Sequence, residues 1–176
     1  MEGDRVTSHR ADPVHLTRRQ NASKESSKIA MKPYPHSYQA KAHGSVTGFV
    51  PVSSLGLPDI DTAPPAEFDG PGDMWSPENL LIAAIADCFI LTFRGVSRAS
   101  AFAWTGLDCQ VDGILEPVSG TTQFTQFRTT ATLTVPGGAN HVKAKELLER
   151  AEKVCLVANS LLGRRTLEVR VIEENG

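Results

Sequence analysis

The chain contains 176 residues, of which 40% are hydrophobic and 22% are charged, a composition ordinary for one globular domain with or without a tail. The net charge of −2 argues against a general nucleic-acid binder, because such proteins normally carry an excess of basic residues. Three cysteines are an odd number, so a complete disulfide framework is not expected.

Residues 1–32 have the composition of an extension rather than of a folded segment. Seven basic side chains outnumber four acidic ones there, and large apolar residues are scarce. Such a segment buries too little surface to offset the entropy of ordering it, so we expect a disordered or poorly ordered extension at 1–32 and a folded domain at 33–176. The segment lacks the apolar core of a signal peptide, and an organelle-targeting peptide would contain fewer acidic residues. The expected location is therefore the cytoplasm, where thiols stay reduced.

The folded part begins with a predicted β-hairpin, which a long loop follows. Residues 38–42 and 45–52 have strand-like patterns, and the His-Gly pair between them suits a tight turn. Residues 53–75 are rich in Gly, Pro and Asp, which predicts a loop with at most one short strand around residues 57–60. A connection of this length inside a domain is often functional or covers a partner.

The next segment predicts a long apolar helix. Ser76 can cap its first turn, Pro77 suits the first helical position, and Glu78 places a negative charge where the helix dipole favours it. From Leu80 to Phe93 only two residues are polar, so the helix is expected to be buried on all sides, in a core or a subunit interface. This run of 14 residues is shorter than the roughly 20 that span a membrane, and no membrane association is predicted.

The second half of the chain predicts two strands, a second helix and a last strand. Alternating apolar residues indicate strands at 107–115 and 127–135. Apolar positions spaced three and four residues apart predict an amphipathic helix from about 141 to 162, with Asn140 as its cap. A strand at 167–172 follows. This order is an α+β pattern and lacks the regular βαβ alternation of a doubly wound fold.

Each predicted helix carries one cysteine on an apolar face, Cys88 in the first and Cys155 in the second. Both can be core residues, since free cysteine is among the most buried residue types. Alternatively they form a redox pair, in which one thiolate attacks an oxidant and the second thiol captures the resulting sulfenic acid as a disulfide. Such a disulfide requires Cα atoms within roughly 4.4–6.8 Å. Cys109 is expected to be structural, and no metal site is predicted, because no cysteine and histidine have the usual ligand spacing.

Two motifs around these cysteines resemble one known family. The segment Ser76–Phe89 is similar to the signature helix of the OsmC/Ohr family (osmotically inducible protein C and organic hydroperoxide resistance protein), with Glu78 ten residues before Cys88. The segment Glu152–Ser160 resembles the motif around the family's second cysteine. The resemblance extends over about residues 38–174, and therefore over essentially the whole predicted domain.

The resemblance implies an α+β, OsmC-like fold, in which an antiparallel sheet with two long helices forms an intertwined homodimer around a buried central helix. It also implies a thiol-dependent peroxidase that reduces organic hydroperoxides. In that reaction Cys88 attacks the O–O bond, Cys155 resolves the product as a disulfide, and Glu78 orients the group that activates the thiol. No cofactor and no nucleic acid are implied. An external dithiol, which is a lipoylated protein in part of the family, restores the enzyme.

Two features of this chain depart from the family pattern. The family activates its first thiol with an arginine from the segment before the helix, and this chain has no arginine between Arg19 and Arg94. Leu156 follows Cys155, where many relatives have proline. The remaining cationic candidates are His36, Lys41, His43 and Arg128. The missing arginine supports an alternative function, namely a non-catalytic OsmC-like dimer that binds a ligand or senses redox state.

Overall fold

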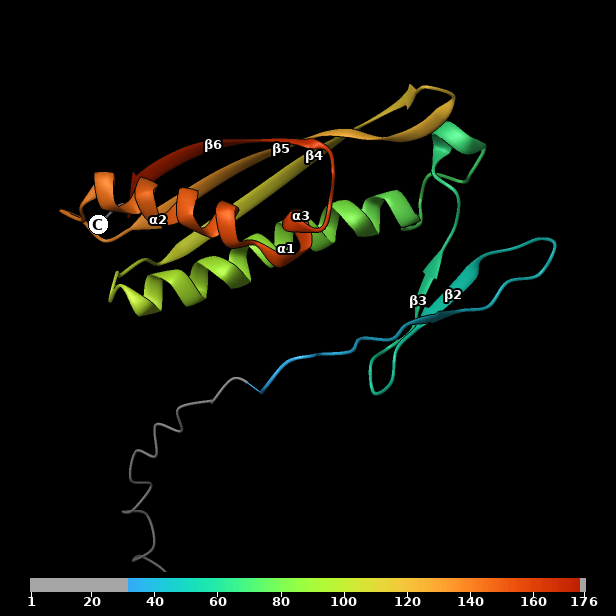
Figure 1. The fold of residues 1–176 in the computed structure, drawn as a ribbon, viewed down its shortest axis with the longest axis horizontal. Helices are drawn as coiled ribbons and strands as arrows, with labels where there is room; N and C mark the ends of the chain where they lie inside the picture. The colour runs from blue at the N-terminus through green and yellow to red at the C-terminus, as the bar shows by residue number, and fades with distance from the viewer. Residues whose placement is uncertain (1–31, 175–176) are drawn as a thin grey trace, which may run out of the picture. The chain divides into compact units, whose positions relative to one another are not determined.

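The computed structural model describes residues 32–174, which fall into two units, residues 32–38 and a larger unit from Gln39 onward (Figure 1). The predicted extension at 1–32 lies outside the described residues except for its last residue, and it stays a prediction. All of the helices and strands described below lie in the larger unit, which contains two three-stranded sheets.

The first sheet consists of β1 (Lys41–Ala42), β2 (Val50–Ser53) and β3 (Ile60–Thr62), which are antiparallel and lie in that order. The predicted hairpin is present with shorter strands, and the short strand lies at Ile60–Thr62, later than the predicted 57–60. The connection between β1 and β2 is longer than a tight turn, and the His43 N–H closes it by donating to the Pro51 carbonyl (3.2 Å). Large apolar side chains in and around this sheet are exposed in the single chain: Phe49, Leu55, Leu57 and Ile60. Clustered apolar exposure of this kind is typical of an interaction surface.

The second sheet consists of β4 (Gly106–Val118), β5 (Thr121–Val135) and β6 (Arg164–Glu173). All three strands predicted in this half of the chain are present and extend beyond their predicted limits. β4 and β5 form a long antiparallel hairpin, whereas β6 runs parallel to β5, so the sheet is mixed rather than wholly antiparallel. A parallel neighbour needs a crossover connection, which the helices between β5 and β6 provide.

The first long helix, α1 (Pro77–Ala99), begins where the sequence predicts. Ser76 and Asn79 form a capping box, in which the Asn79 N–H donates to Ser76 Oγ (3.2 Å) and the Ser76 N–H donates to Asn79 Oδ1 (3.4 Å). The helix has 23 residues, more than its apolar run, and by length and composition alone it is apolar enough to cross a membrane. Core helices of globular proteins pass the same test, and one face of α1 packs on β4 and α2 (Figure 1).

The core lies between the second sheet and a helical layer formed by α1 and α2 (His141–Val154). Every second residue of β5 from 127 to 135 is buried, as the alternating pattern predicts. The largest core side chains come from α1, β5 and α2: Phe89, Phe93, Leu133, Val135, Leu147 and Leu148. On α1 the buried residues form one stripe, so the all-round burial predicted for this helix does not occur within a single chain.

The second long helix, predicted to run to residue 162, is shorter and broken. α2 ends one residue before Cys155, whose backbone is extended (φ −65°, ψ 114°), and α3 (Leu156–Asn159) adds only one short turn. The Asn159 side chain donates to the carbonyl of Lys153 (3.0 Å), which is an acceptor that a continuous helix would use itself. The prediction of one continuous helix is wrong here. The spacing of apolar residues carries no information about a side chain, such as Asn159, that competes for a helix carbonyl.

Replacing Ser76 tests the start of α1. Ser76 is fully buried, and its hydroxyl both accepts from the Asn79 N–H and donates to Asn79 Oδ1. We expect Ser76→Ala to lower the free energy of unfolding by about 1–2 kcal/mol, because a first-turn amide loses its acceptor. Urea denaturation at one fixed protein concentration measures this. Ser100→Ala, at the other end of α1, is the control and should change the value by less than about 0.5 kcal/mol; equal losses would contradict the capping role.

Candidate functional site

The structure brings Cys88 and Cys155 together where α1 meets the break between α2 and α3. Cys155 is buried within a small apolar cluster, and Cys88, which is half-buried on α1, packs against that cluster. Both thiols are free, and each of them shifts the pKa of the other. Proximity of two thiols is the first requirement of a pair that forms a disulfide by exchange.

Cys88 is the thiol whose ionised form the site favours. Burial raises the pKa of Cys88, but hydrogen bonds to its sulfur together lower the pKa by more, so that it lies below its ordinary value. In decreasing order of effect, these bonds come from the backbone of Val157, the thiol of Cys155, the hydroxyl of Thr92 and the backbone of Leu156. Thr92 lies one helical turn beyond Cys88, with its Oγ1 3.9 Å from the sulfur. The thiolate is the nucleophilic form of cysteine, so these bonds favour reactivity.

The other two cysteines are held as neutral thiols. Burial raises the pKa of Cys155 to about 11, and its hydrogen bond to Cys88 acts in the same direction. Burial also raises the pKa of Cys109 to about 11. Cys109 lies on β4 and packs against the same apolar cluster as Cys88. A buried thiol of raised pKa is unreactive while it keeps its proton, which is the behaviour expected of a structural cysteine at position 109.

Glu78 lies in the first turn of α1, ten residues before Cys88. With a rise of about 1.5 Å per residue, the two residues are about 15 Å apart along the helix axis, so a single chain does not bring Glu78 to the thiols. Its Oε2 is buried and has no hydrogen-bond partner among the residues that the structure describes. A buried carboxylate oxygen is unfavourable unless a donor reaches it.

The donors around Cys88 are not the cations that the family pattern implies. Within residues 32–174, no cationic side chain is among the groups that shift the pKa of Cys88. The cationic candidates from the sequence are all exposed: His36, Lys41, His43 and Arg128. Thr92 was not among the predicted site residues, although its spacing of four from Cys88 on a helix was a readable signal. The role of the Leu156 and Val157 amides could not be predicted from the spacing of residues in the sequence, because the direction of these amides depends on the break at Cys155.

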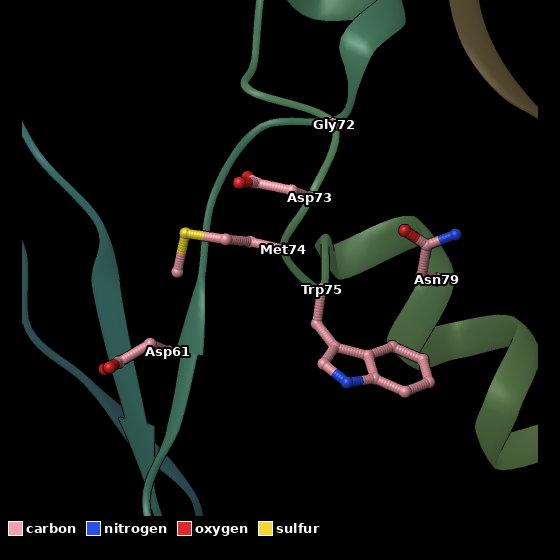
Figure 2. A pocket seen from close by; sticks show the side chains of 6 residues that line it. All are labelled: Asp61, Gly72, Asp73, Met74, Trp75 and Asn79. Atoms are coloured by element: carbon pink, nitrogen blue, oxygen red, sulfur yellow. The ribbon is translucent and has the colours of Figure 1, made fainter.

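An open hollow of about 510 Å³ lies beside β3 and the start of α1. Its lining residues are Asp61, Gly72, Asp73, Met74, Trp75 and Asn79 (Figure 2). Trp75 is 51% exposed, and its backbone pairs with Thr62 at the end of β3. In the described part of the chain, no three potential ligands come together to hold a metal ion. None of the cysteines lines the hollow.

Comparison with known families agrees with this geometry. Residues 70–170 match the family model of the OsmC-like proteins. The chain belongs to the OsmC-like family. The matched residues include α1, Cys88, Cys155 and most of the second sheet, so they contain the candidate site of this OsmC-like protein.

Individual proteins and structures support the same family and fold. The chain is 26% identical over 108 residues to the uncharacterized protein YmaD of Bacillus subtilis (strain 168), covering 60% of this chain and 72% of that protein. An organic hydroperoxide resistance protein OsmC from Legionella pneumophila is 26% identical, with a TM-score of 0.63 over 79% of this chain and 98% of that one. An OsmC-like protein of unknown function from Vibrio cholerae O1 biovar eltor has a TM-score of 0.71 at 15% identity, over 77% and 99% of the two chains. The predicted family and the predicted α+β, OsmC-like fold are confirmed.

We expect Cys88 to be the cysteine that iodoacetamide modifies first at neutral pH, because it alone of the three has a lowered pKa. Its rate should fall as the pH decreases through the Cys88 pKa, since the thiolate fraction falls, and its midpoint should lie below that of the unfolded chain. Mass spectrometry of alkylated peptides over about pH 5 to 11 follows each cysteine separately. Cys109→Ser is the control and should leave the Cys88 profile unchanged. Equal midpoints for Cys88 and Cys109 would refute the assignment, because restricted access changes rates but not midpoints.

Proposed function

We propose that this OsmC-like protein is a thiol-dependent peroxidase that reduces organic hydroperoxides, with Cys88 as the nucleophile and Cys155 as the resolving thiol. The observation that carries this proposal is the packing of Cys88 against the apolar cluster that contains buried Cys155, together with the lowered pKa of Cys88, which favours the thiolate. Membership of the family supports it, as does the similarity to the organic hydroperoxide resistance protein OsmC of Legionella pneumophila.

The first step transfers oxygen to Cys88. The thiolate attacks the terminal oxygen of the hydroperoxide, the O–O bond breaks, and an alkoxide leaves. The Cys88 sulfur becomes a sulfenic acid, so two electrons have passed to the peroxide. The neutral Cys155 thiol belongs to the apolar cluster against which Cys88 packs, and so lies near the reacting atoms. Cys155 gives its proton to the alkoxide, which departs as the alcohol, and Cys155 becomes a thiolate.

The second step forms the disulfide. The Cys155 thiolate attacks the Cys88 sulfur, the S–O bond breaks, and hydroxide leaves and takes up a proton as water. An external dithiol then restores both thiols by two successive exchange reactions. We propose a small dithiol or a lipoylated protein as this reductant, and a reducing compartment such as the cytoplasm as the place where the cycle runs. No cofactor takes part in this scheme.

Hydroperoxide titration tests the proposal. Adding cumene hydroperoxide to reduced protein should consume two of the three thiols, because one disulfide forms. Cys88→Ser should abolish the reaction, whereas Cys155→Ser should react once and leave a sulfenic acid at Cys88 that dimedone traps. Thiol counting and mass spectrometry measure these outcomes. Cys109→Ser, the matched control, should still lose two thiols; a wild-type protein that keeps all three after prolonged exposure would reject the proposal.

A non-catalytic dimer that binds a ligand or senses redox state is the second candidate function. The observation that favours it is that, among the described residues, no cation stands beside the Cys88 sulfur. This candidate requires a Cys88 pKa at or above its ordinary value and no catalytic turnover of hydroperoxides. The hydrogen bonds that lower the Cys88 pKa favour the peroxidase over it.

We further propose that two copies of this chain associate as a homodimer. In the single chain only 22% of the most apolar stretch of α1 is buried, and Leu91 on this helix is 51% exposed. The apolar side chains of the first sheet are exposed as well. Apolar surface of this extent is typical of a subunit interface. The family resemblance implies a second copy as the occupant.

The dimer also gives Glu78 a role that one chain does not allow. Because about 15 Å of helix separate Glu78 from its own Cys88, we propose that its orienting role acts on the thiol of the partner copy. The buried Glu78 Oε2, which has no donor within residues 32–174, supports a partner from outside the chain.

Hybrid dimers of Glu78→Gln chains and Cys88→Ser chains test this arrangement. Each parent homodimer should have little activity. If Glu78 acts across the interface, one of the two sites in a hybrid contains the native Cys88 of one chain and the native Glu78 of the other. The hybrid should therefore regain about half of the wild-type peroxidase rate. Glu67→Gln, at an exposed acid in the turn before α1, is the control and should keep full activity. Hybrids no more active than their parents, or a monomer in sedimentation at micromolar concentration, would contradict the arrangement.

A further inference from the structure

The break at Cys155 redirects two backbone amides. In a continuous helix the Val157 N–H would donate to the Lys153 carbonyl, four residues earlier. Here the Asn159 side-chain amide occupies that carbonyl (3.0 Å), and the Asn159 backbone N–H donates to the Cys155 carbonyl (3.0 Å). The backbone groups of Val157 and Leu156 instead lower the pKa of Cys88, which packs with Val157 against the apolar cluster around Cys155.

Asn159 is fixed from both ends of its amide group. Its Nδ2 donates to the Lys153 carbonyl, and its Oδ1 accepts from Arg165 Nη1 (2.8 Å). Arg165 is itself anchored, because its Nε lies 3.2 Å from Glu152 Oε1 and the two side chains are only 28% and 20% exposed. This chain of contacts links β6 to α2 through Asn159, whose amide bonds the Lys153 carbonyl beside the break.

The Cys88 sulfur lies against this break. α1 packs on α3, and Cys88 and Val157 contact the same apolar cluster around Cys155. The Thr92 hydroxyl, 3.9 Å from the sulfur, comes from α1 itself. Backbone N–H groups that converge on one atom stabilise an anion through their dipoles, and hydrogen bonds to an ionised partner are stronger than neutral ones.

We propose that the Leu156 and Val157 amides stabilise the Cys88 thiolate in place of a cationic side chain, and that Asn159 and Arg165 are positioning residues that hold these amides toward the sulfur. The inference rests on the proposed function, since it explains how a peroxidase of this sequence activates its thiol. Arg165 acts on the turn and not on the sulfur. Leu156 matters through its N–H, which a proline at this position would lack.

Leu156→Pro removes one of these amides with little other change. The Leu156 side chain is 72% exposed, position 156 is the first residue of α3, and Cys155 already has the extended backbone that a residue before proline adopts. We expect the alkylation midpoint of Cys88 to rise, so that its thiolate population at a pH below the midpoint falls roughly threefold to tenfold. Leu156→Ala, which keeps the N–H, is the matched control and should titrate as wild type.

Asn159→Ala tests the positioning residues by a different route. Without the side-chain amide, the Lys153 carbonyl is free to recapture the Val157 N–H, and the Cys88 midpoint should again rise. Ser160→Ala removes a neighbouring bond, from Ser160 Oγ to the Leu156 carbonyl (3.0 Å), and is the control that should leave the midpoint unchanged. Circular dichroism verifies that each variant is folded. If Asn159 had only a structural role, a folded variant would keep the wild-type alkylation midpoint of Cys88.

The outcomes separate this inference from the proposed function. If folded Leu156→Pro or folded Asn159→Ala titrates at Cys88 as wild type does, the amides do not stabilise the thiolate and the inference is overturned, even where hydroperoxide still consumes two thiols. If both variants raise the midpoint while the wild-type protein ignores hydroperoxides, the inference holds and the peroxidase proposal fails. A rise in both folded variants but in neither control supports the inference.

Discussion

A thiol that must ionise in order to react lies here in a place where burial opposes its ionisation. Burial has the largest single effect on the pKa of Cys88, and it acts against the thiolate. The hydrogen bonds that outweigh it come from two segments, namely from Thr92 on α1 and from Cys155 with the two residues directly after it. These segments meet only because α1 and α2 pack side by side on one face of the second sheet. The reactivity of the site therefore depends on the core beneath it.

Features set by local chemistry were predictable from the sequence, and features set by distant partners were not. Ser76 and Pro77 fix the start of α1 through neighbouring residues, and the alternation along β5 fixes its buried face, so both predictions are confirmed. The parallel pairing of β6 with β5 depends on a crossover, which no local pattern specifies. The break at Cys155 depends on an Asn159 that Arg165, on β6, holds in place. Apolar spacing alone favoured a continuous helix there.

The contrast between the sequence and the single chain is sharpest on α1. Apolar residues on nearly all sides predict burial on all sides, yet one chain buries a single stripe of the helix. The first sheet shows the same imbalance, since apolar side chains such as Phe49 and Ile60 remain exposed. A second copy of the chain that covers these apolar residues would bury them. For this reason the homodimer belongs with the proposed function.

Backbone amides and a guanidinium group stabilise a thiolate by different means. A guanidinium carries a full charge that acts over several ångströms, whereas an amide dipole acts at hydrogen-bonding distance and only in the right orientation. In a site that relies on amides, the stabilisation of the thiolate therefore depends on how well the turn orients them. In this chain Arg165 pairs with Glu152 and donates to Asn159, and Asn159 bonds to that turn. The family pattern places a cation beside the sulfur. In this chain the cation is Arg165, which acts on the sulfur indirectly, through Asn159 and the backbone amides of the turn.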